Sequence, residues 1–120
     1  MTEKRLKLGA WGEEQAACWL RRQGARILER NLRTPVGEID IVARLKKQIL
    51  FVEVKTRTSL EFGTPAEAVG PRKQQQIIRT AQWFLQQEKP NNLQPRFDVI
   101  SVLCENDKIR IEHFPNAFEL

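Results

Sequence analysis

The sequence predicts an α/β domain in which a central mixed β-sheet is flanked by helices. Two segments, residues 9–23 and 70–89, carry apolar residues at helical spacing, and runs rich in Val and Ile lie between and after them. No internal repeat is present, and the polar segments at residues 90–95 and after residue 115 are too short to separate domains. We therefore expect a single domain over residues 1–120, large enough to bury a hydrophobic core.

The first half of the chain is expected to form a helix, a strand and a β-hairpin. Apolar residues recur every three or four positions in the helical segment, and Gly24 is placed to end it. Two runs rich in Val and Ile, separated by three polar residues, are typical of a hairpin, which we place at the centre of the sheet. In chain order, the predicted elements are a helix over residues 9–23, a strand over 26–32, a turn over 34–37, and strands over 38–45 and 49–56.

The second half is expected to form a long loop, a helix and a second pair of strands. Pro71 stands at the first helical position, where its missing N–H costs nothing, and Pro90 follows the helix. A loop of this length has a backbone that is free to line a functional site. In chain order, the predicted elements are a loop over residues 57–69, a helix over 70–89, and strands over 96–104 and 108–114 joined by residues 105–107.

The composition narrows the classes of function. The formal charge is +5, and residues 1–90 hold 17 basic against 10 acidic side chains, which favours a polyanionic partner such as nucleic acid. No apolar run approaches the roughly 20 residues of a membrane span, and the first residues lack the apolar core of a secretory signal. We therefore predict a cytoplasmic protein without a membrane partner. Cys18 and Cys104 have no metal-site spacing and are interpreted as reduced, partly buried residues.

Acidic residues stand inside the two strands that otherwise have the composition of core. Side chains alternate along a strand, so Glu38 and Asp40 are expected on one face of the first strand, and Glu53 and Lys55 on one face of the second. Burying a carboxylate is costly unless a cation or hydrogen bonds compensate. The opposite faces are expected to form core through Ile39, Ile41, Val52 and Val54.

This pattern predicts a magnesium site. If the polar faces coincide, Asp40 and Glu53 supply hard oxygen ligands, with Lys55 one pleat further on. A metal there stabilises charge on a phosphodiester and lowers the pKa of a bound water, which Lys55 positions or deprotonates, as in metal-dependent nucleases. Taken alone, Glu53 and Lys55 are more typical of an ordinary ion pair at a strand edge than of a catalytic site.

A longer set of motifs resembles the YraN-like family of bacterial proteins over nearly the whole chain. This family looks like a branch of the PD-(D/E)xK, restriction-endonuclease-like nucleases, similar to archaeal Holliday junction resolvases. The motifs are, in chain order, Gly9-x-x-Gly12-Glu13-x-x-Ala16, Arg30-Asn31, Gly37-Glu38-Ile39-Asp40, Phe51-Val52-Glu53-Val54-Lys55-Thr56-Arg57, Phe62-Gly63, Lys73 and Phe97-Asp98-Val99.

The resemblance implies a restriction-endonuclease-like (tRNA endonuclease-like) fold and a catalytic set. Asp40 matches the aspartate of the motif, and Glu53 and Lys55 match its (D/E)xK. Glu13 matches the first-helix glutamate that resolvase-type nucleases bring towards the metal, which is Mg²⁺ or Mn²⁺. Ile39 stands where the motif has proline, a substitution that is usual in the YraN-like group. The implied substrate is DNA, branched or single-stranded, and a two-fold junction implies a homodimer whose contact face the sequence does not reveal.

Several of these residues have simpler alternatives. Glu13 also suits the first turn of a helix, where the helix dipole favours an acid. Glu38 is interpreted as a structural partner of Arg33 or Arg57, and Asp98 as the partner of a neighbouring basic residue. Residues proposed to contact the phosphate backbone are Arg30, Arg33, Arg57 and Lys73, although Lys73 fits a solvated helix face better.

Two functions follow from these observations. The first is a metal-dependent endonuclease that hydrolyses DNA, including branched or recombination intermediates. The second is a non-catalytic nucleic-acid-binding module that keeps the nuclease fold and acts in DNA repair, recombination or uptake. Strand cutting that requires a divalent ion distinguishes the first from the second, because both predict binding that weakens with salt.

Overall fold

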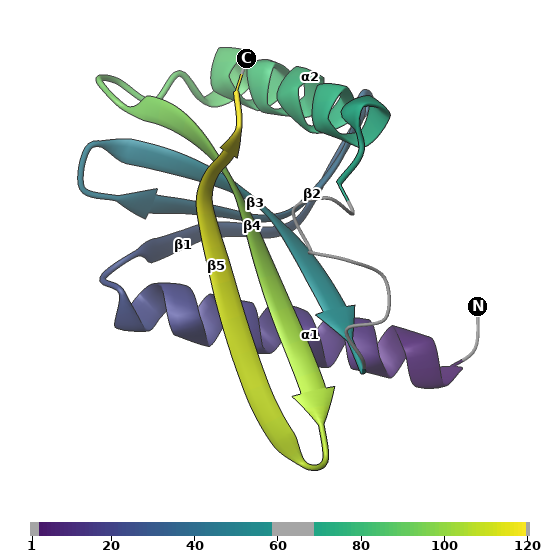
Figure 1. Cartoon of the computed structure of the whole chain (residues 1–120). Coiled ribbons are helices and arrows are strands. Elements are labelled where there is room, and N and C mark those ends of the chain that lie inside the picture. Colours follow the sequence, from purple (N-terminus) through teal and green to yellow (C-terminus); the bar gives the residue numbers. More distant parts are fainter. Residues whose placement is uncertain (1–2, 59–68, 120) are drawn as a thin grey trace.

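A computed structural model describes residues 3–58 and 69–119, with the side chains of residues 3–6 excepted. Five strands form one mixed sheet in the order β1-β2-β3-β4-β5, with β3 and β4 parallel and the other neighbours antiparallel (Figure 1). The predicted fold class, a mixed sheet flanked by helices as in the restriction-endonuclease-like fold, is confirmed. The elements are α1 (Glu3–Arg22), β1 (Arg26–Thr34), β2 (Gly37–Leu45), β3 (Gln48–Arg57), α2 (Pro71–Glu88), β4 (Gln94–Glu105) and β5 (Lys108–Phe118).

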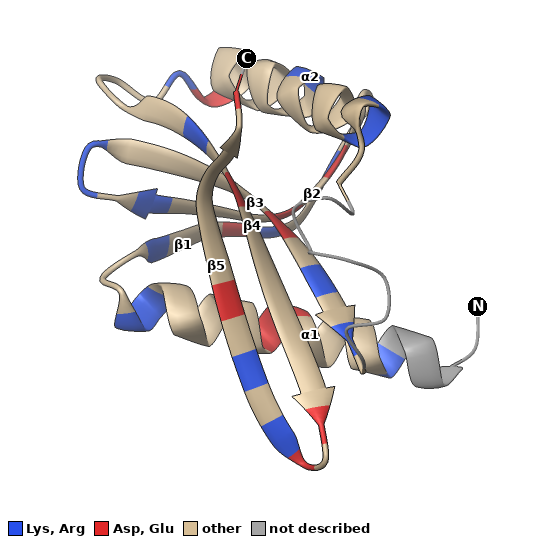
Figure 2. Ribbon diagram, viewed as in Figure 1, with Lys and Arg blue, Asp and Glu red and all other residues tan. Residues whose placement is uncertain are grey.

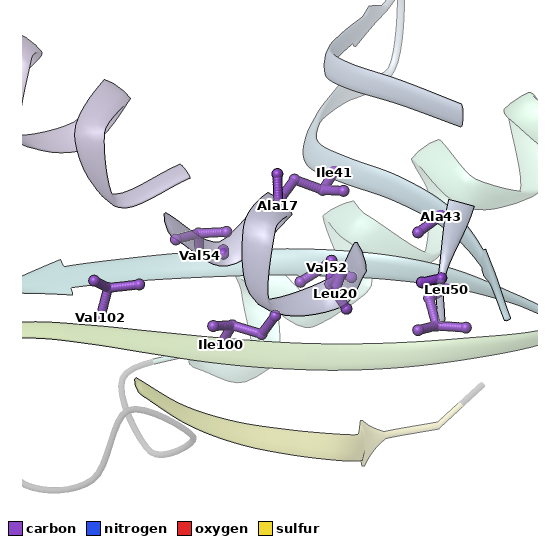
Figure 3. Close-up of a cluster of buried hydrophobic side chains, with 11 residues drawn as sticks. Ala17, Leu20, Ile41, Ala43, Leu50, Val52, Val54, Ile100 and Val102 are labelled. Carbon is purple, nitrogen blue, oxygen red and sulfur yellow. The ribbon is translucent and has the colours of Figure 1, made fainter. Parts of the chain in front are cut away.

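The two helices cover opposite faces of the sheet, each over its own apolar cluster. Alternate residues of β3 show this division, because Val52 packs with α1 while Phe51 packs with α2. On the α1 side, small and branched aliphatic side chains from the helix and strands interlock around Leu20 and Val52 (Figure 3). On the α2 side, the ring of Phe51 stacks on Phe97 at 5.6 Å and meets Phe84 edge-on at 6.0 Å. The sheet is thus buried on both faces near its centre.

The ends of the helices follow from local chemistry, with one correction. Gly24 adopts φ 95° and ends α1, as expected, while Pro71 begins α2 and Lys89 closes it in the left-handed conformation. However, α1 begins at Glu3 rather than at residue 9. The segment before Gly9 consists of good helix formers, and an isolated glycine weakens a helix by only about 1 kcal/mol, so it does not start a new element.

The strand predictions are confirmed in order and number, with longer boundaries. β5 continues to Phe118, beyond the expected end at residue 114, because proline is tolerated on an edge strand, where Pro115 lies. The β4–β5 turn places Asn106 and Asp107 at positive φ, which both residue types tolerate. The predicted loop over residues 57–69 falls mostly on residues 59–68, outside the described residues, as does the Phe62-Gly63 motif. Neither described helix has an apolar stretch long enough to cross a membrane.

Candidate nuclease-like active site

The candidate site lies where β2 and β3 separate. Within the described chain, backbone pairing between these strands runs from Leu45–Gln48 to Ile41–Val52 and ends there. One step further on, the Oδ2 atom of Asp40 accepts a hydrogen bond from the backbone N–H of Val54 at 2.8 Å. A side-chain carboxylate therefore takes the place of the next ladder partner, and space opens between the two strands.

The alternation of β2 changes at Asp40, contrary to the expectation that Ile39 and Ile41 share a face. Ile41 packs in the α1-side cluster, whereas Ile39 packs in the α2-side cluster. On the neighbouring β1, Asn31 adopts φ 52°, a left-handed conformation that interrupts a regular strand. The irregular backbone at this point turns Asp40 towards β3 instead of leaving it on one face with Glu38.

A cavity of about 500 Å³ occupies this opening. It is open to both carboxylates that the sequence placed in the strands, Asp40 and Glu53, and to Glu13 from α1. The full lining comprises Leu8, Gly9, Glu13, Asn31, Asp40, Glu53, Val54 and Thr56. The structure thus brings together acidic residues separated by up to 40 positions, since Glu13 and Glu53 line the same cavity.

Gly12 allows α1 to approach the sheet at this site. A Cβ atom at residue 12 would overlap Oγ1 of Thr56 and would lie 2.8 Å from the Cβ and Cγ2 atoms of Thr56. Only glycine fits against β3 there, and Glu13 follows directly. Because α1 begins at Glu3, Glu13 lies well inside the helix, so its interpretation as a first-turn acid is wrong.

Burial and like charge dominate the electrostatics of the carboxylates. The side chain of Glu53 is 9% exposed, and burial followed by the charge of Asp40 raises its pKa to about 7. Burial also raises the pKa of Asp40, against the opposing hydrogen bond from Val54. Burial and then the charge of Asp40 raise the pKa of Glu13. Burial, and the charge of Asp40 at Glu13 and Glu53, therefore oppose full ionisation of these carboxyl groups.

Two lysines place positive charge near Asp40 and Glu53. The Nζ atom of Lys55 lies 4.0 Å from Oε1 of Glu53, on the same strand face as predicted. The charge of Lys73, from the first turn of α2, lowers the pKa of both Asp40 and Glu53. Lys73 is half-buried and is not among the residues that line the cavity. Each of the two helices therefore contributes one charged side chain near the strand carboxylates.

The three arginines that were predicted to contact phosphate have different surroundings in the structure. Nη1 of Arg30 donates to Oε2 of Glu14 at 2.6 Å, and the charge of Arg30 lowers the pKa of Glu13. Nε of Arg30 is buried without a hydrogen-bond partner among the described residues. Arg33 instead pairs with the exposed Glu38 at 3.8 Å, which confirms Glu38 as a structural partner. Arg57 is half-buried at the end of β3, and none of the three arginines lines the cavity.

The donor set suits a hard divalent cation held by two protein ligands. No group of three His, Cys, Asp or Glu side chains forms a complete metal-binding cluster in residues 3–58 and 69–119. Mg²⁺ commonly needs only one or two carboxylates, because it keeps several of its waters. Asp40 and Glu53 provide such a pair beside a cavity with room for water, and a cation would relieve their mutual repulsion. The residues present therefore fit the predicted metal.

A second buried polar cluster lies apart from this cavity. Asp98 is fully buried and accepts hydrogen bonds from Nε and Nη2 of Arg96 at 2.8 and 2.7 Å, which confirms its predicted basic partner. Nε2 of His113 lies 2.7 Å from Asp98, and Nε1 of Trp19 donates to Nδ1 of His113 at 3.1 Å. This cluster ties α1 to β4 and β5. Sequence reasoning missed His113 and Trp19 as partners because 94 positions separate them.

Sequence reasoning also gave no role to Asn31, Thr56 or the backbone of Val54. All three line the cavity. Asn31 and Thr56 stand in motifs shared with the YraN-like family, which was the available signal. Their role depends on the separation of two strands and on the approach of α1, neither of which is a local property of the sequence.

Comparison with known proteins gives a consistent result. A family model described as "Uncharacterised protein family UPF0102" matches residues 12–102. A UPF0102 protein of Syntrophotalea carbinolica is 58% identical over 120 residues, covering 100% of this chain and 98% of the relative. A UPF0102 protein of Geobacter metallireducens is 50% identical over 113 residues, covering 94% and 93%. One of Syntrophomonas wolfei is 47% identical over 112 residues, covering 93% and 97%. The resemblance to the YraN-like family is thereby confirmed.

Proposed function

The chain belongs to the uncharacterised protein family UPF0102, and we propose that it is a metal-dependent, endonuclease-like protein that binds DNA and hydrolyses phosphodiester bonds, including those of branched recombination intermediates. One observation carries the proposal. Asp40 and Glu53 meet beside one open cavity, and Lys55 lies 4.0 Å from Glu53. Two carboxylates that line an open cavity, with a lysine next to one of them, are the groups that metal-dependent phosphodiester hydrolysis requires.

Asp40 and Glu53 would hold Mg²⁺ or Mn²⁺, while Glu13 lines the same cavity from α1. A bound metal of this kind stabilises charge on phosphoryl oxygens and makes a water more acidic. Asp40 is already fixed for this task, because the N–H of Val54 holds one of its oxygens. Glu53 is held by its burial in the central strand. A site on rigid strands keeps its ligands in place before substrate arrives.

The lysines would bind the anionic substrate. Lys55 is one-third exposed and can donate to the attacking water or to a phosphate oxygen while keeping its contact with Glu53. Lys73 on α2, whose charge lowers the pKa of both Asp40 and Glu53, attracts the phosphate backbone. Arg30, whose charge lowers the pKa of Glu13, adds positive charge next to the site. Such contacts position DNA without reading its sequence.

The test is a cleavage assay combined with a metal titration. Labelled four-way junction, flap, single-stranded and duplex DNA are incubated with Mg²⁺, Mn²⁺ or EDTA, using the parent protein, Asp40→Asn, Glu53→Gln and Lys55→Ala. Mn²⁺ binding is measured separately by calorimetry. We expect cutting only with a divalent ion, and loss of cutting in all three variants. Mn²⁺ affinity should fall at least about tenfold in Asp40→Asn and Glu53→Gln and change little in Lys55→Ala.

Glu38→Gln is the matched control, because Glu38 is an exposed carboxylate on the same strand as Asp40 but lies outside the cavity. It should cut DNA and bind Mn²⁺ like the parent protein. Unchanged Mn²⁺ affinity in Asp40→Asn would refute the site. Tight, salt-sensitive DNA binding in EDTA without cutting on any substrate would replace the nuclease proposal with the non-catalytic binding module.

A further inference from the structure

One edge of the sheet is open and regular. β5 lies at the end of the strand order and pairs only with β4 in the part of the chain that the structure describes. From Lys108 to Phe114 its register against β4 is continuous, and the irregularity comes only between Phe97 and Val99 of β4, near Pro115. An edge with a continuous register presents unpaired N–H and C=O groups, which favour pairing with another strand.

The other edge is protected, which makes the contrast informative. β1 carries a register shift between Ile27 and Glu29, and Asn31 adopts a positive φ. Bulges and twisted backbone of this kind are devices that prevent edge pairing. Residues 108–114 of β5 contain no positive φ and no proline. The β1 edge is thus protected against pairing with another strand, whereas the β5 edge is available for it.

The side chains of this open edge are self-complementary in charge. On the face towards α2, Lys108 and Arg110 are followed by Glu112, a pattern visible as two blue bands and a red band along β5 (Figure 2). Arg110 and Glu112 are 66% and 38% exposed, and Nε of Arg110 lies 3.4 Å from Oε1 of Glu112. On the opposite face, Ile109 is 50% exposed and Ile111 is only partly covered.

Charge selects one register for pairing with a second copy. When a two-fold axis perpendicular to the sheet relates two antiparallel strands, side chains stay on the same face in both copies. One residue, on which the register is centred, then lies opposite its own copy across the axis. Centred on Arg110, the pairing sets this arginine against itself, although Lys108 then lies opposite the partner's Glu112, and centred on Glu112 it sets two glutamates together. Centred on Ile111, it sets Arg110 opposite the partner's Glu112 twice and Ile111 against the partner's Ile111. Opposite charges directly across strands stabilise pairing, and like charges weaken it.

We infer that two copies of this chain pair through their β5 strands, antiparallel about Ile111, and join their sheets into one. α1 and α2 leave the outer edge of β5 uncovered (Figure 1), so neither helix obstructs this arrangement. A single strand pair makes a small interface, and the dimer is therefore expected to dissociate in the micromolar range, roughly 1–100 µM. The inference does not depend on nuclease activity, because the residues involved lie outside the cavity.

Sedimentation velocity over that concentration range tests the inference. The parent protein should show a concentration-dependent dimer. Arg110→Glu alone and Glu112→Arg alone should each weaken dimerisation about tenfold or more, because each places like charges across both pairs. An equimolar mixture of the two variants should recover the dimer, since every pair then joins opposite charges. Arg26→Glu on the protected β1 edge is the matched control and should dimerise like the parent protein.

Hydrogen exchange gives an independent readout. Amides of residues 108–114 should gain protection as the concentration of the parent protein rises, and thermal melts confirm that each variant is folded. The inference is overturned by a parent protein that stays monomeric throughout, which leaves the edge to another occupant. It is equally overturned by a dimer that tolerates both single charge reversals, or by a mixture that does not recover the dimer.

Discussion

The contact between Gly12 and Thr56 gives the sharpest test of how α1 is placed at the site. Gly12→Ala adds a Cβ atom that overlaps Oγ1 of Thr56. Turning the Thr56 side chain removes that overlap but leaves the Cβ of Thr56 at 2.8 Å, whereas ordinary contacts lie at 3.4–4 Å. α1 must therefore move away from β3 by about 0.6 Å or more. Overpacking of this kind typically costs about 1–3 kcal/mol, or somewhat more, against a gain of about 1 kcal/mol in helix propensity.

Gly9→Ala provides the matched comparison, because it is the same substitution in the same helix. No described atom lies within 4 Å of a Cβ at residue 9, so only the helix propensity acts, and this variant should gain up to about 1 kcal/mol. We expect Gly12→Ala to lose about 1–2 kcal/mol relative to the parent protein in urea unfolding. The loss should shrink in a Thr56→Ala background, as a double-mutant cycle would measure.

The displaced helix should also affect the cavity, since Glu13 follows Gly12. Mn²⁺ affinity should therefore fall in Gly12→Ala and stay close to the parent value in Gly9→Ala. Equal stability of Gly12→Ala and Gly9→Ala would show that α1 does not press on β3 at Thr56. The placement of Glu13 beside Asp40 would then lose its structural basis.

Three further predictions concern charge. The stability that protonated Glu53 contributes is fully present below its ordinary pKa of 4.5 and is lost as the pH rises through about 7. Glutamine resembles the protonated form at every pH, so Glu53→Gln in EDTA should be about 3 kcal/mol more stable than the parent protein at pH 8 and nearly equal to it at pH 4. Urea titrations at the two pH values would measure this difference. Lys73→Met should raise the pKa of Glu53 and thereby weaken Mn²⁺ binding at pH 7 in calorimetry, and unchanged affinity would exclude Lys73 from the site. Asp98→Ala should destabilise the protein by about 3–5 kcal/mol in urea unfolding, because it leaves the largely buried guanidinium of Arg96 without its ion-pair partner. The control Asp107→Ala, at an exposed position, should change the stability little.

Much of the fold follows from local patterns. The order of helices and strands, the turn at Asn106 and the start of α2 at Pro71 depend on residues within a few positions of each other, and these predictions are confirmed. The predicted ends of helices and strands were wrong where the surrounding structure tolerated a glycine or a proline that usually ends an element. Gly9 is accommodated inside α1, and Pro115 is tolerated in β5 because that strand lies at the edge.

The candidate site was only partly predictable for a different reason. Strand alternation placed Glu53 and Lys55 on one face, and Lys55 does lie 4.0 Å from Glu53. The same rule failed at Ile39, because the backbone of the neighbouring strand is irregular at Asn31 and the pairing with β3 stops. Alternation holds only while the ladder is regular, and a site is often where it is not.

By itself the sequence determined an α/β domain, a sheet with acidic residues in its central strands, and membership of a family through motifs spread along the chain. Tertiary structure alone decided that β2 and β3 separate at Asp40, that Gly12 lets Glu13 reach the opening, that Lys73 joins it, and that β5 keeps an open edge. The physical reason is that periodicity and capping arise between chain neighbours. The charge, burial and free edges of a site depend on which distant segments pack together, and no local pattern specifies that.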